Sequence, residues 1–208
     1  MTRSRKAIFL DKDGTLLEDE PYNVDPNLIR LMPGAAEAAR ALREAGYLIV
    51  VVTNQSGVAR GLYPESALTP LRQALATLLR AAGADVDGFY WCPHHPGGSI
   101  ARYARQCSCR KPEPGLLLRA RDELRVDLRE SWMVGDILDD VEAGRRAGCH
   151  VCLVNNGHET EWVLTRDRVP ELVVRDLREL ARHVLSRRWK EGRPRDPAPI
   201  RRSTGMIA

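Results

Sequence analysis

The sequence predicts an α/β fold, a Rossmann-like parallel sheet with helices on both faces. Short apolar runs alternate with stretches in which apolar residues recur at helical spacing, which is typical of a parallel sheet with crossover helices. The run YLIVVVTN at 47–54 is almost continuously apolar and β-branched, as expected of a strand buried on both faces. The sequence contains no evident internal repeat or second-domain boundary, which indicates one domain.

The expected elements follow one another along the chain. The first helix has Pro33 near its start and Gly46 at its end, the usual places for these residues. Pro70 could break the second helix. Residues 92–113 lack periodicity and are expected to form an irregular loop. The predicted elements are strand 6–10, helix 33–46, strand 47–54, helix 64–83, strand 86–92, helix 114–125, strand 131–136, helix 138–148, strand 150–157, strand 171–174 and helix 176–189.

Length and composition are ordinary for one compact domain, with 208 residues of which 43% are hydrophobic. We expect a single domain over 1–189, with an inserted loop at 92–111, and a basic, flexible tail at 190–208. No apolar run approaches the ~20 residues that span a bilayer. The N-terminal apolar stretch is shorter than the roughly 7–15 residues of a secretory signal. The sequence therefore predicts a cytoplasmic protein without a membrane partner.

The net charge of +4 is concentrated in the C-terminal stretch RRWKEGRPRDPAPIRRSTGMIA. Because this stretch is rich in proline and charge and has little to bury, a solvated tail is favoured over a nucleic-acid contact. The chain also lacks an aromatic-rich strand of the kind that stacks bases. We expect no nucleic-acid partner. We also expect a monomer, because no exposed apolar stripe is evident.

Polar residues follow several predicted strands, and the carboxyl ends of parallel strands meet at one edge of a sheet. Asp11 and Asp13 follow the first strand, and Thr53 lies at the end of the second. Lys111 follows the irregular loop, and Asp136 ends the strand at 131–136. The string DKDG alone would fit a tight turn. A turn does not explain why four segments deliver three acids, a hydroxyl and a lysine to one edge, so we expect a site there.

This set of side chains is suited to phosphoryl transfer. Asp11, Asp13 and Asp136 concentrate negative charge, which Mg²⁺ relieves because it prefers hard oxygen ligands. A metal also lets phosphate approach a carboxylate. Lys111 and Thr53 can bind phosphoryl oxygens, and this chemistry needs mainly positioning and charge neutralisation. An aspartate can form an aspartyl-phosphate, while a second carboxylate donates and accepts the proton.

The sequence resembles the haloacid dehalogenase-type phosphatases in its D-x-D-G-T, its strand-ending Thr, its Lys and its late G-D. Over roughly residues 7–180 it more closely resembles the D-glycero-D-manno-heptose 1,7-bisphosphate 7-phosphatases, with histidinol-phosphate phosphatases as near relatives. The strings that carry this likeness are FLDKDGT, VVTNQSGVARG, YWCPHHP, CSCRKPEPGLL and MVGD. The resemblance implies Mg²⁺-dependent removal of the 7-phosphate from a small phosphorylated sugar, the heptose bisphosphate. Histidinol phosphate is the alternative substrate.

The resemblance also implies a role for each site residue. Asp11 would be the nucleophile and Asp13 the general acid and base. Mg²⁺ would be held by Asp11, the backbone carbonyl of Asp13 and Asp136, and the phosphoryl group by Thr53 and Lys111. Substrate recognition is implied for two loops and one arginine, namely Asp19, Glu20, Pro21 and Tyr22, then Asn54, Gln55 and Ser56 beside Thr53, and Arg110, whose guanidinium could bind a second phosphate.

One position departs from this pattern. Heptose enzymes often carry a lysine directly after the late Asp, whereas this chain has Ile137. The next acids, Asp139 and Asp140, are expected to open a helix, although one of them could hold waters on Mg²⁺. No site role is predicted for the three remaining histidines, His150, His158 and His183.

The loop at 92–111 contains a second candidate site. It offers three thiolates and one imidazole, a tetrahedral donor set typical of structural Zn²⁺. The set is Cys92, His94, Cys107 and Cys109, with His95 as an alternative to His94. The resemblance includes this C-x-H and C-x-C arrangement, and bound zinc would steady the start of the segment that contains Lys111. Cys149 and Cys152 are expected to be core residues.

The sequence is compatible with two function classes, an enzyme and a binding module. Neither the interval from Asp13 to Thr53 nor that from Thr53 to Lys111 leaves room for a full cap domain, which favours an open site and a small substrate. The alternative is a zinc-stabilised binding module without catalysis. Such a module has no need of the five catalytic-type residues at the sheet edge, so the sequence favours an enzyme.

Overall fold

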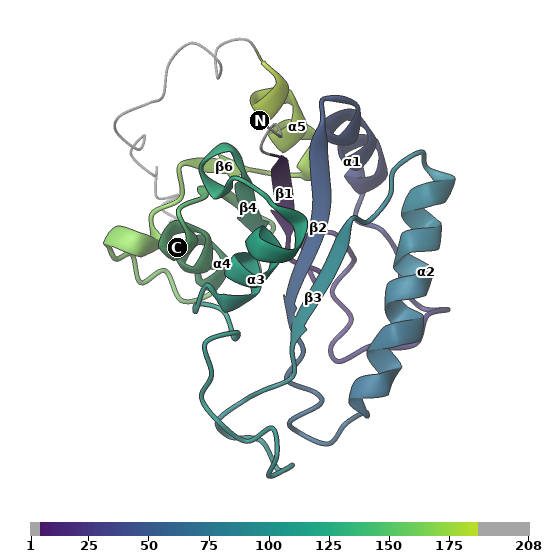
Figure 1. Cartoon of the computed structure of the whole chain (residues 1–208), viewed down its shortest axis with the longest axis vertical. Coiled ribbons are helices and arrows are strands. Elements are labelled where there is room, and N and C mark those ends of the chain that lie inside the picture. The colour runs from purple at the N-terminus through teal and green to yellow at the C-terminus, as the bar shows by residue number, and fades with distance from the viewer. Residues whose placement is uncertain (1–4, 187–208) are drawn as a thin grey trace, which may run out of the picture.

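The strands form one parallel sheet in the order β3-β2-β1-β4-β5-β6 (Figure 1). This computed structural model describes residues 5–186. The predicted tail at 190–208 and the end of the predicted domain therefore lie outside the described residues. The strands are β1 (Lys6–Leu10), β2 (Tyr47–Asn54), β3 (Gly88–Cys92), β4 (Trp132–Gly135), β5 (His150–Val154) and β6 (Leu172–Val174).

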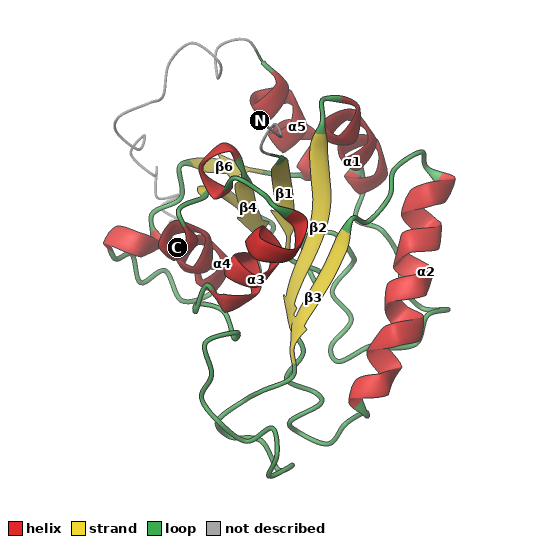
Figure 2. Cartoon of the chain, in the orientation of Figure 1, coloured by secondary structure: helices red, strands yellow, loops and turns green. Residues whose placement is uncertain are grey.

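Among residues 5–186, five α-helices cover the two faces of the sheet, as predicted (Figure 2). Ile8 and Leu10 of β1 belong to a core shared with α1, α2 and α5, whereas Ala7 and Phe9 pack with α3 and α4. This alternation follows from the period of two in a strand, which points successive side chains to opposite faces. The helices are α1 (Ala35–Glu44), α2 (Leu68–Ala81), α3 (Gly115–Leu124), α4 (Leu138–Ala147) and α5 (Leu177–Leu185).

The expected break at Pro70 does not occur. A short 3₁₀ turn, Glu65–Ala67, leads into α2, and Pro70 is the third residue of that helix. In the first turn of a helix the missing N–H has no intrahelical partner to lose, so proline is tolerated there. The predicted strand at 47–54 agrees with β2 at both ends.

The order in which strands are added to the sheet changes direction at the boundary between β1 and β4. The chain proceeds from β1 to β2 and β3 on one side and then returns to place β4 on the other side of β1. Ligands of such sheets bind at the carboxyl ends of the strands at this switch point. Asp11 follows β1 and Asp136 follows β4, so the two acids lie on either side of it.

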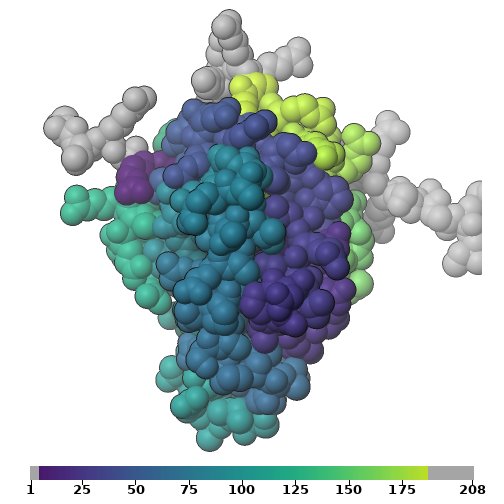
Figure 3. Space-filling view, turned by 90° about the vertical axis from the view of Figure 1, so that its right-hand side faces the viewer, coloured from purple at the N-terminus to yellow at the C-terminus, as the bar shows by residue number. Residues whose placement is uncertain are grey.

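Long connections surround this edge, and no separate cap domain occurs among residues 5–186. Residues 11–34 connect β1 to α1, and residues 93–114 connect β3 to α3 without a helix or strand. Figure 3 shows the side covered by α2, with part of the segment after β1 beside it and the teal 93–114 segment at the lower tip. Within the described range, no helix is both long and apolar enough to cross a membrane.

Candidate active site

The turn after β1 brings Asp11 to the sheet edge. The N–H of Asp11 donates to the carbonyl of Val134 in β4 at 2.9 Å, and the N–H of Lys12 donates to the Asp11 carboxylate at 2.7 Å. Gly14 has a φ of +72°, and a Cβ there would collide with the Asp136 carboxylate and the His158 ring. Only glycine allows both the left-handed backbone and this close approach.

Three acids converge at this edge: Asp11, Asp136 and Asp140, which offer oxygens within 4.8 Å of one another. Asp140 is fully buried in the first turn of α4, and burial raises the pKa of its carboxyl well above the usual value. Burial, together with repulsion from Asp11, also raises the pKa of Asp136. Gly135 makes room for Asp140, because a Cβ at this position would meet its carboxylate.

Lys111 lies inside this acidic cluster. Its Nζ is 2.7 Å from Asp11 Oδ1 and 2.6 Å from Asp140 Oδ1, and it donates to the carbonyl of Val52 at 3.1 Å. Burial disfavours the charged ammonium, but attraction to the two carboxylates outweighs it and raises the pKa of Lys111. The lysine therefore stays a cation although its side chain is 1% exposed.

Asn54 holds the backbone of Lys111 in place. The N–H of Lys111 donates to Asn54 Oδ1, and Asn54 Nδ2 donates to the Lys111 carbonyl, both at 3.0 Å. These two bonds join the end of β2 to the segment after the cysteine loop, 57 residues further on. Asn54 is thus engaged with the main chain that presents the lysine.

The Asp13 carboxylate lies outside the three-acid cluster. Lys12 Nζ is 2.7 Å from its Oδ1, and Gln55 Nε2 donates to its Oδ2 at 3.2 Å. Gln55 Nε2 also donates to Thr53 Oγ1 at 2.9 Å. Burial raises the pKa of Asp13, partly offset by Lys12. Asp140, expected to open a helix or to hold waters on Mg²⁺, lies in the first turn of α4 and is also the third of the clustered carboxylates.

His158 contacts the site, although the sequence predicts no role for it. Its Nδ1 is 2.7 Å from Asp136 Oδ2, while Thr15 Oγ1 donates to Asp136 Oδ1 at 2.9 Å. In the same loop, Asn156 Nδ2 donates to the carbonyl of Gly14 at 2.6 Å, and the Glu159 carboxylate accepts from the N–H of Leu138 at 2.5 Å. A lone histidine in an irregular loop carries no spacing signal, so only the fold reveals these contacts.

A cavity of about 270 Å³ adjoins Asp13. Most residues with an expected substrate role line it, and Glu20 is the exception in the first loop. Arg110 lines a separate hollow of about 660 Å³ that also contains Lys111 and Asp139. The structure thus divides the expected recognition residues between two hollows. The lining of the first includes Asp19, Pro21, Tyr22, Asn54, Gln55 and Ser56.

The predicted zinc ligands come together, and His94 rather than His95 is among them. Ligand atoms of Cys92, His94, Cys107 and Cys109 lie within 4.8 Å of one another. Cys109 Sγ is 3.1 Å from the Cys92 sulfur and 3.4 Å from His94 Nδ1. Its pKa is lowered to about 5, chiefly by the contact with Cys92, which favours the thiolate that binds metal. All five cysteines are free thiols.

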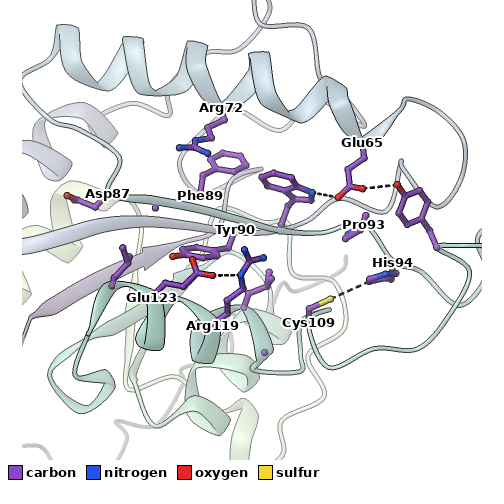
Figure 4. Close-up of a pocket in the computed structure, with 16 residues that line it drawn as sticks. Glu65, Arg72, Asp87, Phe89, Tyr90, Pro93, His94, Cys109, Arg119 and Glu123 are labelled. Carbon is purple, nitrogen blue, oxygen red and sulfur yellow. Dashed lines mark hydrogen bonds and ion pairs between the residues drawn. The ribbon is translucent and has the colours of Figure 1, made fainter.

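A further hollow of about 670 Å³ lies along the outer edge of β3, away from the carboxylate edge (Figure 4). Several of its charged groups are paired within the chain. Arg119 contacts Glu123 at 2.7 Å, and Glu65 accepts from Trp91 Nε1 at 2.8 Å and from the Tyr103 hydroxyl at 2.7 Å. Glu65 thereby ties the cysteine loop to β3.

Comparison with known proteins decides the family. Residues 108–180 match a family model described as HAD-hydrolase-like. The chain is 45% identical over 173 residues to the D-glycero-beta-D-manno-heptose-1,7-bisphosphate 7-phosphatase of Salmonella typhi, covering 79% of this chain and 92% of that protein. The Yersinia pestis protein of the same name is 45% identical over 147 residues, covering 71% and 78%. This chain belongs to the HAD-like phosphatases.

Solved structures agree with this assignment of a HAD-like phosphatase. A Mesorhizobium loti protein described as HAD-like phosphatase superposes with a TM-score of 0.76 at 37% identity, covering 87% of this chain and 86% of that one. The D,D-heptose 1,7-bisphosphate phosphatase from B. bronchiseptica, complexed with magnesium and phosphate, gives a TM-score of 0.72 at 32% identity. That match covers 86% of this chain and 98% of the other. The protein is thus a phosphomonoester hydrolase.

The carboxylate cluster of this HAD-like phosphatase fits a divalent cation. Asp11, Asp136 and Asp140 place three buried carboxylates around the single ammonium of Lys111. Uncompensated buried charge is costly, and hard oxygen donors match Mg²⁺. The cysteine cluster fits zinc equally well, because three sulfurs and one ring nitrogen complete a tetrahedral set.

Proposed function

We propose that this HAD-like phosphatase removes the 7-phosphate from D-glycero-D-manno-heptose 1,7-bisphosphate through an aspartyl-phosphate on Asp11. The observation that carries the proposal is the convergence of Asp11, Asp136 and Lys111 at the sheet edge, with Asp13 and Thr53 linked by Gln55 beside them. The substrate is supported by the names of the relatives at 45% identity, which also favour the β anomer.

In the first step, the Asp11 carboxylate attacks phosphorus and the bond from phosphorus to the sugar oxygen breaks. Asp13 donates its proton to that oxygen, so the sugar leaves as an alcohol. The raised pKa of Asp13 supports this role, because a carboxyl must be protonated to act as an acid. Lys111 is fixed beside Asp11 and, together with Thr53, binds the phosphoryl oxygens.

In the second step, water attacks the phosphorus of the aspartyl-phosphate. Asp13, now a carboxylate, accepts the proton of this water, and the bond from phosphorus to Asp11 breaks. Inorganic phosphate leaves and both aspartates return to their starting states. The same carboxyl can serve both steps because it adjoins the cavity that the sugar vacates.

Two metals are part of the proposal. Asp11, Asp136 and the backbone carbonyl of Asp13 would hold Mg²⁺, with Asp140 close enough to join through a water. When bound, this ion supplies charge neutralisation that lets the phosphate approach the carboxylates. The cysteine cluster would hold a structural Zn²⁺, which keeps Arg110 and Lys111 in position because Cys109 directly precedes them.

Substrate recognition is proposed for two places. The cavity beside Asp13 would accept the sugar end that carries the 7-phosphate. Arg110 lines a second hollow that also includes Lys111, so it would bind the other phosphate. We further propose that residues 1–189 form a single domain and that the phosphatase acts as a cytoplasmic monomer without a nucleic-acid partner.

The deciding experiment measures phosphate release with Mg²⁺ from both anomers of heptose 1,7-bisphosphate, fructose 1,6-bisphosphate and histidinol phosphate. We expect kcat/KM on one heptose anomer to exceed the others by at least about 100-fold, a difference of ~2.7 kcal/mol in transition-state binding. A preference for histidinol phosphate would identify that compound, and not the heptose bisphosphate, as the substrate. Asp11→Asn should abolish the acid-stable, hydroxylamine-sensitive phosphoenzyme, and activity near that of the parent would reject the covalent route.

A further inference from the structure

The amide of Gln55 is fully engaged by the protein. Its Nε2 donates to Asp13 Oδ2 at 3.2 Å and to Thr53 Oγ1 at 2.9 Å, and its Oε1 accepts from the Tyr63 hydroxyl at 2.8 Å. A glutamine amide has only two N–H donors. Both are used, and the residue is only 3% exposed. Gln55 therefore has no donor left for a substrate, although it lines the cavity.

Tyr63 contacts the other end of this amide. Its hydroxyl donates to Gln55 Oε1, while the nitrogen end faces Asp13 and Thr53. Burial raises the pKa of Tyr63 to about 12, which keeps the hydroxyl protonated and able to donate. The Tyr63 ring lies against Gly57, where a Cβ would collide with it. The backbone turn after β2 thus leaves space for this ring.

Asp13 is consequently held from both sides. Lys12 Nζ contacts Oδ1 at 2.7 Å and Gln55 contacts Oδ2. A carboxyl that protonates a leaving oxygen must keep its geometry within a few tenths of an ångström, because proton transfer depends steeply on distance and alignment. Two opposed contacts provide this restraint without touching the substrate.

We propose that Tyr63 and Gln55 are positioning residues that hold Asp13 in place to protonate the leaving group, and that Gln55 is not a substrate ligand. This inference rests on the proposed role of Asp13 but not on the identity of the sugar. Tyr63 acts through Gln55, and Gln55 acts directly on Asp13. The reaction and its proton balance are unchanged, since neither residue gains or loses a proton.

Leaving groups differ in how much they depend on protonation by Asp13. A phenol of low pKa departs as its anion and gains little from protonation, whereas a phenol of high pKa depends on Asp13. Loss of Tyr63 or Gln55 should therefore lower kcat/KM selectively for substrates with poor leaving groups. Loss of general packing, or of a contact to the phosphoryl group, should slow all of them alike.

The test is a Brønsted plot of log kcat/KM against leaving-group pKa for a series of substituted phenyl phosphates, with Mg²⁺ present. These substrates share one shape and carry no sugar hydroxyls, so lost sugar contacts cannot mimic the effect. The variants are Tyr63→Phe and Gln55→Leu, and Asp13→Asn marks the complete loss of the acid. Tyr47→Phe is the matched control, because Tyr47 is a buried tyrosine at the opposite end of β2.

We expect a steeper negative slope in both variants, with the poorest leaving group reduced by 10-fold or more. Tyr63→Phe removes no contact of Thr53 and should leave p-nitrophenyl phosphate within about 2-fold of the parent. Tyr47→Phe should leave the line unchanged. Parallel lines, or lines that coincide with the parent, would overturn the proposal. If Gln55→Leu does not fold by its melting curve, the slope of Tyr63→Phe decides alone. If the parent phosphatase does not hydrolyse heptose bisphosphate but the variants show the steeper slope, the proposed substrate is wrong and the positioning roles stand.

Discussion

His158 Nδ1 lies 2.7 Å from Asp136 Oδ2, although the two residues are 22 positions apart in the sequence. Thr15 contacts the other oxygen of the same carboxylate at 2.9 Å. The acid at the end of β4 is therefore held on both oxygens by residues from two loops. Such contacts orient a carboxylate before a metal arrives, which lowers the entropy lost on binding.

We expect His158→Ala to weaken Mg²⁺ binding by roughly 10-fold, the lower end of the effect usual for residues that support metal ligands. Calorimetric titration of the protein with Mg²⁺ measures this directly. His183→Ala is the matched control, because His183 lies on α5 and is exposed. An unchanged dissociation constant in His158→Ala would show that the contact does not support the metal ligand.

The Lys111 ammonium should contribute strongly to stability, because it is the partner of two buried carboxylates. Lys111→Met leaves Asp11 and Asp140 without it, and breaking a buried pair costs ~3–5 kcal/mol of the free energy of unfolding. Urea denaturation at pH 7 checks this. Adding Asp140→Asn should restore part of the loss, since one uncompensated charge is removed. Equal stability of Lys111→Met and the parent would contradict the prediction.

Alanine variants of Gly14 and Gly46 distinguish the cost of a left-handed backbone from the cost of a steric clash. Both have positive φ, +72° and +84°, but a Cβ at Gly46 meets nothing within 4 Å. Gly46→Ala should therefore lose only the ~1–2 kcal/mol of a left-handed alanine. Gly14→Ala should lose more and should also weaken Mg²⁺ binding, because its methyl group displaces Asp136. Similar melting temperatures for the two variants would disprove the close approach.

Zinc removal should lower stability and activity together. We expect purified protein to contain about one zinc per chain, since a four-ligand set of this kind binds a single ion. Cys109→Ser should reduce both the zinc content and the melting temperature. Cys149→Ala should keep the zinc, because Cys149 is a buried core cysteine outside the cluster. An unchanged melting curve after chelation would argue against a structural metal.

Arg110 should discriminate between substrates with one and two phosphates. Its guanidinium lines the hollow next to Lys111, where a second phosphate could reach it. Arg110→Ala should raise KM for the bisphosphate about 10-fold or more, equivalent to ~1.4 kcal/mol of binding, and should barely change KM for a monophosphate. Steady-state kinetics on both substrates decide the point. A similar rise on both would assign Arg110 to the reacting phosphate.

The sequence alone determined the features that depend on local pattern. The apolar run at 47–54 is a strand from end to end, because continuous β-branched residues fit a strand covered on both faces. The convergence of Asp11, Lys111 and Asp136 also followed from the pattern, since parallel strands present their carboxyl ends at one edge. The clustering of Cys92, Cys107 and Cys109 with His94 or His95 was expected from their residue types together with the family resemblance, and the structure places His94 in the cluster.

Only the tertiary structure decided contacts between segments that carry no periodic signal. His158 reaches Asp136 because the loop after β5 folds back over the end of β4. Asp140 joins the carboxylates because Gly135 lets the first turn of α4 approach the sheet. The Gln55 amide donates to Asp13 at its nitrogen end and accepts from the Tyr63 hydroxyl at its oxygen end. The orientation of a side chain depends on its partners in space, and those partners lie in loops whose paths local sequence does not specify.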